Sequence, residues 1–372
     1  MPHGIRTTTI AEGARPTSAI ATEVIGVVAT ATAVGAPAIA ALNAAFPLGQ
    51  PVAVTSLRAA IANSGTAGTL KSVLEGIESQ ANAPTVVVRI DDVDDVEAGL
   101  VALRGAEAPT GLRPRILGIP GLETPAGIAA LGIAAKRLRG FGYFKPPGAT
   151  VAEAIAGALP TADRELMAVW PEFAGAFSGR AVAMMLGHRS RVDREIGWHQ
   201  SSSNILLSGV SGGLNPSISF DQYDDTHDAA LLNAANITTM IRRDGWRFWG
   251  VRTRAGLADA TFAFEPTVRA TQAVEDEIEA GINWASDKPL TPRLVSEIIK
   301  TIKAAGRRYV TAGRLLGFDC WFDSDMNAAD DLNAGKLKLD YDLTVPSPAE
   351  DIGLSVHVTG RYYNDFADQI PA

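Results

Sequence analysis

The C-terminal segment, from Lys336 onward, does not have the pattern of the end of a compact domain. Within Lys336–Val345 apolar and polar residues alternate, which predicts a half-buried strand. Pro346 and Pro348 then break the chain. Beyond them, a second alternating run places four apolar side chains on one side: Ile352, Leu354, Val356 and Val358. A terminal strand beyond a proline-stiffened linker can pair with its own sheet or with the sheet of a neighbouring molecule.

The N-terminus offers a similar extended piece. Ile5 and Ile10 lie in the thinly apolar run Gly4–Glu12, which Gly13 and Pro16 follow. Pro16 limits how far strand pairing can continue past it. Two extended arms of this kind indicate a protein that is linked to copies of itself.

The composition supports a large folded core. Of the 372 residues, 47% are hydrophobic and 20% are charged, which excludes global disorder. The formal net charge of −8 argues against a general nucleic-acid-binding protein, which normally carries a basic surface. The one cysteine, Cys320, lies in an apolar, strand-like run and is expected to be buried. With one cysteine no disulfide can form within the chain, which suits a reducing compartment.

An uncharged segment, Val24–Ala45, has the length of a membrane span. It consists mostly of Ala, Thr, Gly and Val, with Pro37 in the middle, so few of its residues favour insertion into a bilayer. A buried strand over Val24–Ala31 that leads into a small-residue loop is the better interpretation. The start of the chain also lacks the basic and apolar regions of a secretory signal. We therefore expect no membrane insertion.

The middle of the chain alternates between strand and helix patterns. Continuous apolar runs predict buried strands, and longer amphipathic or Ala-rich runs predict helices. The expected strands are Thr85–Ile90, Arg115–Ile119, Gly142–Phe144 and Glu165–Trp170, and the expected helices are Val93–Arg104, Thr124–Arg139 and Ser178–Glu195. This alternating order implies a mainly parallel sheet with helices on its faces.

From Ile237 onward the pattern changes. The runs Ile237–Arg242 and Arg247–Val251 flank a hairpin-like turn. The elements expected after it are helices over Glu265–Ser286 and Thr291–Gly306 (extending to Gly313), a strand around Cys320 and a short helix near Ala328–Asn333. The expected fold class is therefore mixed α/β and α+β. Four segments are predicted: an N-terminal arm (1–20), an α/β core (21–262), a C-terminal α+β domain (263–345) and a C-terminal arm (346–372).

One run, Gly209–Gly213, matches the nucleophile-elbow pattern G-x-S-x-G around Ser211. The elbow requires a strand, a sharp turn and then a helix. A strand over Ile205–Leu207 is plausible, but Leu214–Ser217 has turn chemistry rather than a helical pattern. An α/β hydrolase that uses Ser211 is thus a rival function, and a glycine-rich surface loop is the preferred interpretation.

No other run has the pattern of a catalytic, cofactor or metal site. In Gly65–Ser72, which resembles a phosphate loop, Leu70 stands where the loop requires glycine before Lys71. The five histidines show no metal-ligand spacing, and the acidic clusters around Asp91 and Asp221 lack the EF-hand pattern. We therefore expect no catalytic residue, no cofactor and no metal.

The helix that begins at Thr291 combines an apolar stripe with a basic stripe. At about 100° per residue, the apolar arc consists of Leu294, Val295, Ile298, Ile299, Ile302 and, if the helix is extended, Tyr309. The opposite arc consists of Arg293, Lys300, Lys303, Arg307 and Arg308, with Glu297 as the one acid among them. Such a stripe is either an ordinary solvated helix face or a docking face for an acidic partner.

Several blocks of the sequence resemble one protein family, in order, from about Gly4 to Val358. They are TVVVRI at Thr85–Ile90, RPRILGIPGL at Arg113–Leu122, ELMAVWP at Glu165–Pro171, GWH at Gly197–His199, TMIRRDGWRFWGVRT at Thr239–Thr253, WASDKP at Trp284–Pro289 and AGKL at Ala334–Leu337. The chain is similar to the tail sheath protein of contractile-tailed bacteriophages, of the P2-like type also found in R-type pyocins. The block Thr239–Thr253 is the most specific, and none of the blocks is a catalytic motif.

The resemblance implies a structural subunit rather than an enzyme. In this family, six-subunit rings stack helically around a rigid tail tube, and the sheath contracts to drive the tube through a target envelope. The implied partners are further copies of the chain, the tail tube protein, and the baseplate and tail terminator proteins, without direct contact with nucleic acid. The implied location is the tail of a virion or a phage-tail-like particle that is assembled in the host cytoplasm. The sheath of a related non-phage contractile injection system is a second alternative.

The resemblance also implies roles for the predicted segments. The α/β core becomes the outer domain and the C-terminal domain becomes the inner, tube-facing domain. The tube-docking residues would be Arg293, Lys300, Lys303 and Arg307. The arms would add strands to neighbouring subunits through Ile5 and Ile10 at one end and through Ile352, Leu354, Val356 and Val358 at the other.

Overall fold

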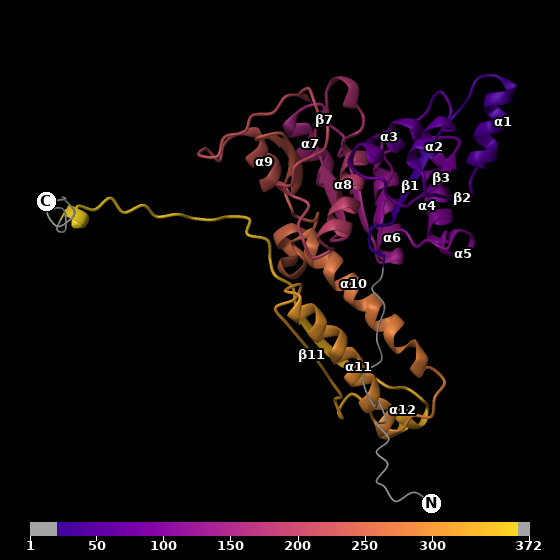
Figure 1. Ribbon diagram of the computed structural model, residues 1–372, viewed down its shortest axis with the longest axis vertical. Coiled ribbons are helices and arrows are strands. Elements are labelled where there is room, and N and C mark those ends of the chain that lie inside the picture. Colours follow the sequence, from indigo (N-terminus) through magenta and orange to yellow (C-terminus); the bar gives the residue numbers. More distant parts are fainter. Residues whose placement is uncertain (1–20, 364–372) are drawn as a thin grey trace, which may run out of the picture.

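The computed structural model describes residues 21–363. It consists of an α/β unit, an elongated C-terminal unit that projects from it, and an extended segment that leads to the C-terminus (Figure 1). The inter-subunit residues predicted at Ile5 and Ile10 lie outside the described residues.

The α/β unit is built on an eight-stranded sheet with the order β10-β9-β6-β5-β4-β1-β3-β2. Its strands are β1 (Ile25–Thr30), β2 (Pro51–Val54), β3 (Thr85–Ile90), β4 (Ile116–Gly118), β5 (Phe141–Phe144), β6 (Leu166–Val169), β9 (Ile237–Arg242) and β10 (Trp246–Trp249). The inner strands pair in parallel, with Ile25 of β1 opposite Thr85 and Ile116. Strands β2 and β10, at the two edges, run antiparallel to their neighbours. The predicted mixed α/β architecture with a mainly parallel sheet is confirmed.

Helices cover both faces of this sheet (Figure 1). They are α1 (Ala36–Ala45), α2 (Leu57–Ala62), α3 (Leu70–Gln80), α4 (Val96–Arg104), α5 (Glu107–Thr110), α6 (Pro125–Leu138), α7 (Val151–Ala158), α8 (Ala181–Glu195) and α9 (Asp228–Ala234). One buried cluster, which includes Val27 and Phe141, lies beneath α3 and α8. The other, which includes Val28 and Leu117, lies beneath α4 and α6. Successive residues of one strand therefore enter opposite cores, which is why these strands have continuous apolar sequences.

The expectation of a small-residue loop after β1 is wrong, because Ala36–Ala45 forms α1. Alanine is the strongest helix former, and Pro37 lies in the first turn, where its missing N–H is not needed. Only Leu42 of this helix is buried, and the helix lies at the periphery of the α/β unit (Figure 1). Within residues 21–363, no helix is both long enough and apolar enough to cross a bilayer.

The C-terminal unit pairs two long helices with a β-hairpin. Its elements are α10 (Glu265–Ile282), α11 (Pro292–Thr311), β11 (Gly317–Trp321), α12 (Ala329–Asn333) and β12 (Asp340–Thr344). A third apolar cluster fills the unit, and it includes Ile298, Ile302 and the buried Cys320. Burial raises the pKa of the Cys320 thiol to about 11, so the thiol is protonated at neutral pH. The predicted burial of Cys320 is confirmed.

The strand expected over Lys336–Val345 is shorter than predicted, because β12 begins only at Asp340. Just before it, the backbone of Lys338 is bound by a side chain. The N–H of Lys338 donates to Asn327 Oδ1 at 2.9 Å, and its carbonyl accepts from Asn327 Nδ2 at 3.0 Å. These backbone groups are therefore not available for a strand ladder.

A buried ionic cluster joins α8 to the first turns of α10, where the two units meet. Arg189 binds Asp193 at 2.6 Å and Glu265 at 3.3 Å. Arg269 also pairs with both of these carboxylates, and the Tyr143 hydroxyl donates to Glu265 at 2.9 Å. The four ionised side chains are at most 3% exposed. Two positive and two negative charges compensate each other here, which is the condition under which buried charges are tolerated.

Further along α10, a second set of ion pairs holds the helix against the α/β unit. Asp276 pairs with Arg115, which precedes β4, and at 2.9 Å with Arg139, which follows α6. Near the start of the described chain, Arg269 donates to the carbonyl of Thr22 at 3.3 Å. The direction in which the C-terminal unit projects is thus set by charged contacts at both its first and its middle turns.

His188 of α8 is buried beside this junction as a neutral imidazole. Its Nε2 lies 2.9 Å from the carbonyl oxygen of Ser202, and its Nδ1 accepts a hydrogen bond from Arg191 at 3.0 Å. Because arginine can only donate, the proton of the neutral ring belongs on Nε2, where it binds the carbonyl. Burial lowers the pKa of His188 to about 3.

This burial makes the stability of the protein sensitive to mild acid. Between about pH 6.5 and pH 3 the unfolded chain binds a proton at His188 that the folded chain does not. The contribution of the neutral His188 to the free energy of unfolding is complete above pH 6.5. Below that pH it decreases by about 1.4 kcal/mol per pH unit. We expect the free energy of unfolding to fall by about 2 kcal/mol more in the wild type than in His188→Gln between pH 6.5 and pH 5. Urea titrations at several pH values measure the free energy of unfolding of both proteins. If it changed equally with pH in the wild type and in His188→Gln, or if NMR showed that His188 titrates near pH 6.5 in the folded protein, the expectation would be contradicted.

Candidate functional site

Ser211 lies on an exposed loop that lacks the geometry of a nucleophile elbow. The strand expected before it is reduced to a single bridge between Leu206 and Arg247. After it, Leu214–Asn215 form the short strand β8, paired with β7 (Glu172–Phe173), where an elbow requires a helix. In the part of the chain that the structure describes, no group of three or more His, Cys, Asp or Glu side chains could hold a metal ion. The candidate sites are therefore surfaces of the C-terminal unit and its arm.

Helix α11 is positioned by its cap and by one glycine. Thr291 Oγ1 accepts a hydrogen bond from the N–H of Leu294 at 3.2 Å, and Pro292 begins the helix. At Gly306 the ring of Phe318 from β11 lies directly against the helix, and an added Cβ would come within 1.9 Å of it. Glycine costs about 1 kcal/mol in a helix interior. The close approach of β11 is therefore what requires glycine at this position.

The basic arc predicted on α11 is partly engaged within the subunit. Arg293 pairs with Glu297 one turn away at 3.1 Å. Lys303 pairs with Asp319 of β11 at 2.7 Å, and this hydrogen bond is the main reason why the pKa of Asp319 is lowered. Arg308 pairs with a buried carboxylate of α10. Part of the arc therefore has partners from β11 and α10 that helical periodicity cannot show, and the tube-docking role of Arg293, Lys300, Lys303 and Arg307 stays a prediction.

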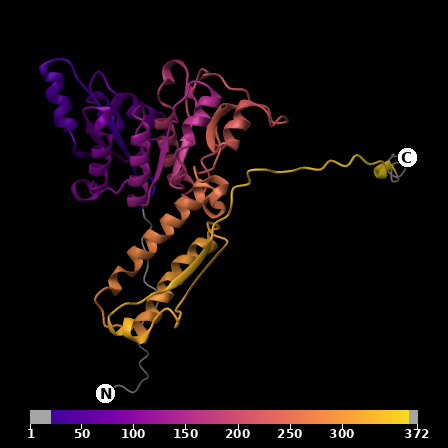
Figure 2. The same cartoon turned by 180° about the vertical axis from the view of Figure 1, so that it is seen from behind.

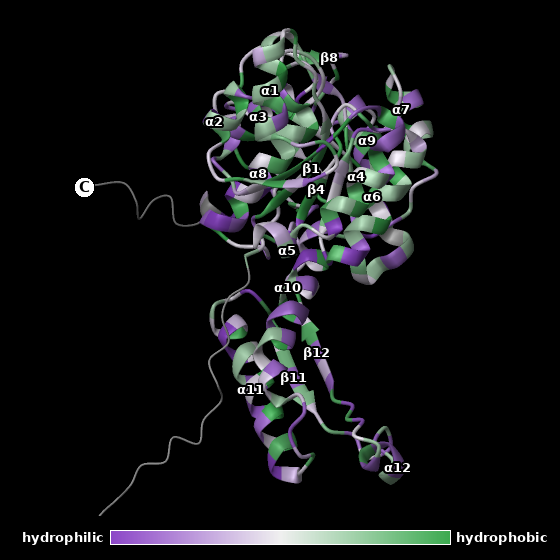
Figure 3. Ribbon diagram, turned by 90° about the vertical axis from the view of Figure 1, so that its right-hand side faces the viewer, coloured by the Kyte–Doolittle hydropathy of each residue, from purple (hydrophilic) through white to green (hydrophobic). Residues whose placement is uncertain are grey.

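Two cations of the arc are left available. Lys300 and Arg307 are both exposed, and neither forms an ion pair with any described residue. They are two helical turns apart, about 10.5 Å along the axis. Figure 3 shows hydrophilic and hydrophobic residues interspersed along the helices of the C-terminal unit, in contrast to the hydrophobic strands at the centre of the sheet. This pair is therefore available for contacts outside the subunit.

The β11–β12 hairpin has two unpaired edges. Gly317–Trp321 and Asp340–Thr344 pair with each other, and no further strand joins them among residues 21–363. Near the end of β11, Trp321 is 41% exposed and Phe322 is 39% exposed. Open strand edges flanked by exposed apolar side chains are sites where another extended chain can add.

The C-terminal arm leaves the C-terminal unit through a groove and is anchored there by one residue. Pro346–Glu350 line this groove together with His199 and Trp249. Arg252 holds Glu350 through two hydrogen bonds, from Nη2 at 2.8 Å and from Nε at 3.1 Å. The two residues are 98 positions apart in sequence, so no motif spacing could have predicted this contact.

Beyond Glu350 the arm extends away from the rest of the molecule (Figures 1 and 2). The run predicted as a strand forms no strand in this chain, and its four apolar side chains are between 72% and 98% exposed: Ile352, Leu354, Val356 and Val358. The run was expected to pair either with the chain's own sheet or with the sheet of a neighbour, and in the structure it does not pair with the chain's own sheet. Pairing with a neighbour stays a prediction.

Comparisons with known proteins agree with one another. The family model of the phage tail sheath C-terminal domain matches residues 258–359. The tail sheath protein of Escherichia phage P2 is 37% identical over 390 residues, covering 97% of this chain and 96% of that protein. A putative prophage major tail sheath protein of Pseudomonas aeruginosa is 31% identical and covers 98% of both chains.

The fold also matches solved structures. The sheath of an extracellular contractile injection system, PVC, in its contracted state superposes with a TM-score of 0.74 at 17% identity, covering 97% of this chain and 99% of that one. The contracted helical sheath of the anti-feeding prophage gives a TM-score of 0.72 at 20% identity, covering 95% and 98%. The relatives of 31–37% identity cover 86–98% of this chain and are structural tail sheath proteins rather than enzymes. This protein belongs to the family of contractile phage tail sheath proteins.

Proposed function

We propose that this protein polymerises as helically stacked six-subunit rings around a tail tube and contracts to drive the tube through a target cell envelope. The observation that carries the proposal is the C-terminal arm. It is anchored at Glu350, exposes alternating apolar side chains beyond that point, and belongs to a chain whose β11–β12 hairpin is joined by no further strand among the described residues. If the arm of one subunit added as a strand to the hairpin of the next, its exposed apolar side chains would be covered and the unpaired backbone groups of the hairpin edge would be hydrogen-bonded. Ile5 and Ile10 would give the N-terminal arm the same role.

The direct test is microscopy of the purified full-length protein. A sheath subunit should polymerise into hollow cylinders with six-fold symmetry in negative stain, and tube protein supplied during assembly should appear inside extended ones. A protein that stays monomeric at high concentration under all salt conditions would contradict the proposal.

In this arrangement the C-terminal unit (263–345) is the inner domain, the α/β core (21–262) is the outer domain, and α11 contacts the tube. Of the four docking residues predicted, Lys300 and Arg307 are the ones free to meet an acidic tube wall, whereas Arg293 and Lys303 would first have to leave Glu297 and Asp319. Each exposed contact contributes about 1 kcal/mol or less. Repetition along a tube makes such contacts collectively strong, yet each can still be broken when the sheath releases the tube.

We expect Lys300→Glu combined with Arg307→Glu to abolish extended sheath on the tube. Tube-free cylinders should persist, because they depend on the arms rather than on α11. Electron microscopy of tails assembled with the tube protein, scored for sheath on tubes and for empty cylinders, checks both outcomes.

The matched control reverses two exposed cations of the α/β unit, Arg58 and Lys71, to glutamate. It changes the net charge by the same amount but leaves α11 intact, so tails of normal length should form. Extended tails of normal length in the α11 variant would mean that this helix does not dock on the tube.

The remaining partners follow from the same proposal. The baseplate and tail terminator proteins would contact the two ends of the sheath, and assembly would take place in the cytoplasm of the bacterial host. Two relatives, at 37% and 35% identity, are phage proteins, whereas two of the matched structures come from injection systems. The sheath of a non-phage injection system is therefore the second candidate. Purified particles that lack DNA would favour it.

A further inference from the structure

The turn between β9 and β10 carries arginines that have no role in the surfaces described so far. Arg243 lies in the turn and is exposed, and Arg247 follows it in β10. A third arginine, Arg191 of α8, belongs to the same surface, because Arg191 and Arg247 both bind the extended segment 204–208. We call these three arginines, together with Leu206 of that segment, the arginine face.

Two of the guanidinium groups are held in place by neutral acceptors. Arg247 donates to the carbonyl of Arg243 at 3.0 Å and to the carbonyl of Asn204 at 2.7 Å. Arg191 donates to the carbonyl of Leu206 at 2.6 Å and to the side-chain hydroxyl two residues further on. Neutral acceptors orient a guanidinium group without neutralising its charge. The positive charge of the face is therefore fixed in position and still available to an anion.

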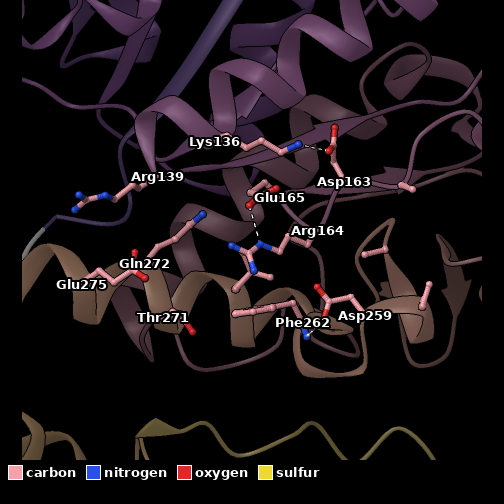
Figure 4. Close-up of a pocket in the computed structure, with 14 residues that line it drawn as sticks. Lys136, Arg139, Asp163, Arg164, Glu165, Asp259, Phe262, Thr271, Gln272 and Glu275 are labelled. Atoms are coloured by element: carbon pink, nitrogen blue, oxygen red, sulfur yellow. Dashed lines mark hydrogen bonds and ion pairs between the residues drawn. The ribbon is translucent and has the colours of Figure 1, made fainter. Parts of the chain in front are cut away.

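No carboxylate compensates these charges within residues 21–363. None of the three arginines forms an ion pair there, and Asp244, the one acid of the turn, is not paired with any of them. The cavity between the α/β unit and α10 differs in this respect (Figure 4). There Lys136 pairs with Asp163. Arg164 likewise pairs with Glu165, at 3.0 Å.

An exposed leucine lies among the arginines of the face. Leu206 forms an isolated antiparallel bridge with Arg247, and its side chain lies over the turn, where a Cβ added to Gly245 would come within 2.4 Å of it. The side chain of Leu206 is nevertheless 46% exposed. Arginine is enriched at protein interfaces, where it often lies beside an apolar anchor. This composition indicates a surface that docks on another protein.

The loop that precedes α9 has the complementary composition, and it projects from the α/β unit (Figures 1 and 2). Its Tyr223 is 99% exposed. Exposed carboxylates flank the tyrosine, from Asp221, Asp224 and Asp225, and none of them forms an ion pair in the described part of the chain. The sequence contains no lysine or arginine between residues 195 and 241. An exposed aromatic ring among carboxylates matches an exposed leucine among arginines.

The loop and the arginine face are not in contact within one subunit. Phe220, at the base of the loop, packs against Trp249 at the end of β10, with ring centroids 5.7 Å apart, whereas Arg243 precedes the start of that strand. Among the described residues, no hydrogen bond or ion pair joins the loop to the arginines of the face. A contact in which one subunit offers the face and the next offers the loop can repeat from subunit to subunit, and such contacts build rings and helices.

We propose that the arginine face of one subunit docks on this loop of a second copy of the chain. Tyr223 covers Leu206, and the carboxylates of Asp221, Asp224 and Asp225 meet the arginines. The inference rests on the proposed function, because it adds to the arms a second contact between sheath subunits. Bonds between guanidinium and carboxylate groups are stronger than neutral ones, and a tyrosine ring against a guanidinium adds a cation–π attraction.

The test exchanges one charge of the face with one charge of the loop in the full-length protein. Arg243→Glu and Asp225→Arg, made separately, should each raise the critical concentration for cylinder formation at least about tenfold, because each places like charges opposite one another. Both substitutions in one chain restore opposite charges and should return the critical concentration to within about threefold of the wild type. Sedimentation and negative-stain microscopy measure assembly. Urea unfolding should not change, because both side chains are exposed.

The matched controls, Arg58→Glu and Asp94→Arg, make the same charge changes at exposed positions outside the face and the loop, and each should assemble as the wild type does. Single variants of the face and loop that assemble normally, or a combined variant that does not recover, overturn this inference alone. Recovery of Arg243→Glu by Asp94→Arg instead of Asp225→Arg would place the contact on another acidic segment and also overturn it. A wild type that forms no cylinders would overturn the proposed function together with this inference.

Discussion

Removal of residues 352–372 will leave a folded protein that forms no cylinders. The deleted residues that the structure describes make almost no contact with the rest of the chain, so the free energy of unfolding should change by less than about 0.5 kcal/mol. The four apolar side chains of the run are 72% to 98% exposed in the single subunit, a condition that assembly would relieve. Circular dichroism and urea unfolding report the fold, and negative-stain microscopy with sedimentation reports assembly.

A pair of double variants tests the same arm without a deletion. If the arm adds as a strand with one face covered, Leu354→Asp with Val356→Asp buries charge and should also prevent assembly. The control, Ser355→Asp with His357→Asp, places the charges on the opposite face of the same strand, where they stay solvated. Cylinders in the truncated protein, or equal behaviour of the two double variants, would show that the arm does not link subunits by strand addition.

The substitution Asp193→Ala will lower the free energy of unfolding by about 3–5 kcal/mol, the range found when one partner of a buried ion pair is removed. Asp193 faces both Arg189 and Arg269 and is completely buried. Without it, two guanidinium groups share Glu265 alone, so a positive charge is left uncompensated in the interior. Equilibrium unfolding in urea measures the loss. Asp193→Asn keeps the volume and some hydrogen bonding, and it should be intermediate.

The surface ion pair between Asp331 and Lys336 provides the control for the buried cluster. Asp331 lies 3.6 Å from Lys336 with both side chains largely exposed, and Asp331→Ala should cost less than about 1 kcal/mol. A similar small loss in both variants would mean that the cluster between α8 and α10 does not hold the two units together.

The strands of the parallel sheet were predictable because burial on both faces leaves a continuous apolar sequence. The run Thr85–Ile90 coincides with β3, and α6 and α11 begin one residue after their capping threonines, Thr124 and Thr291. Local sequence patterns do not predict burial that depends on residues far away in the sequence. In α8, Arg189 and Asp193 have the spacing of a solvated surface pair, yet Glu265 and Arg269 from α10 make their burial possible.

On the candidate surfaces, too, local patterns were predictable and contacts with distant residues were not. Helical periodicity placed the basic residues of α11 on one arc, but it could not show that Asp319 of β11 binds Lys303. The Ala-rich run after β1 contained a helix former and an N-terminal proline, but with little amphipathic pattern it resembled a loop. The cavity between the α/β unit and α10 was not predicted either, since the residues that line it lie far apart in the chain.

In the proposed assembly, the anchor at Glu350 would also set a length scale. Residues 351–363, fully extended at 3.3–3.6 Å each, would span about 45 Å. An arm bound to a neighbour would therefore act as a tether whose residue 363 stays within that radius of Arg252. Subunits could rotate or slide past one another inside this radius without breaking their link, and an arm that detached would rebind rapidly because its partner strand stays at high local concentration. In the proposed assembly, the largest rearrangement that keeps two subunits linked would thus be limited by the length of this tether.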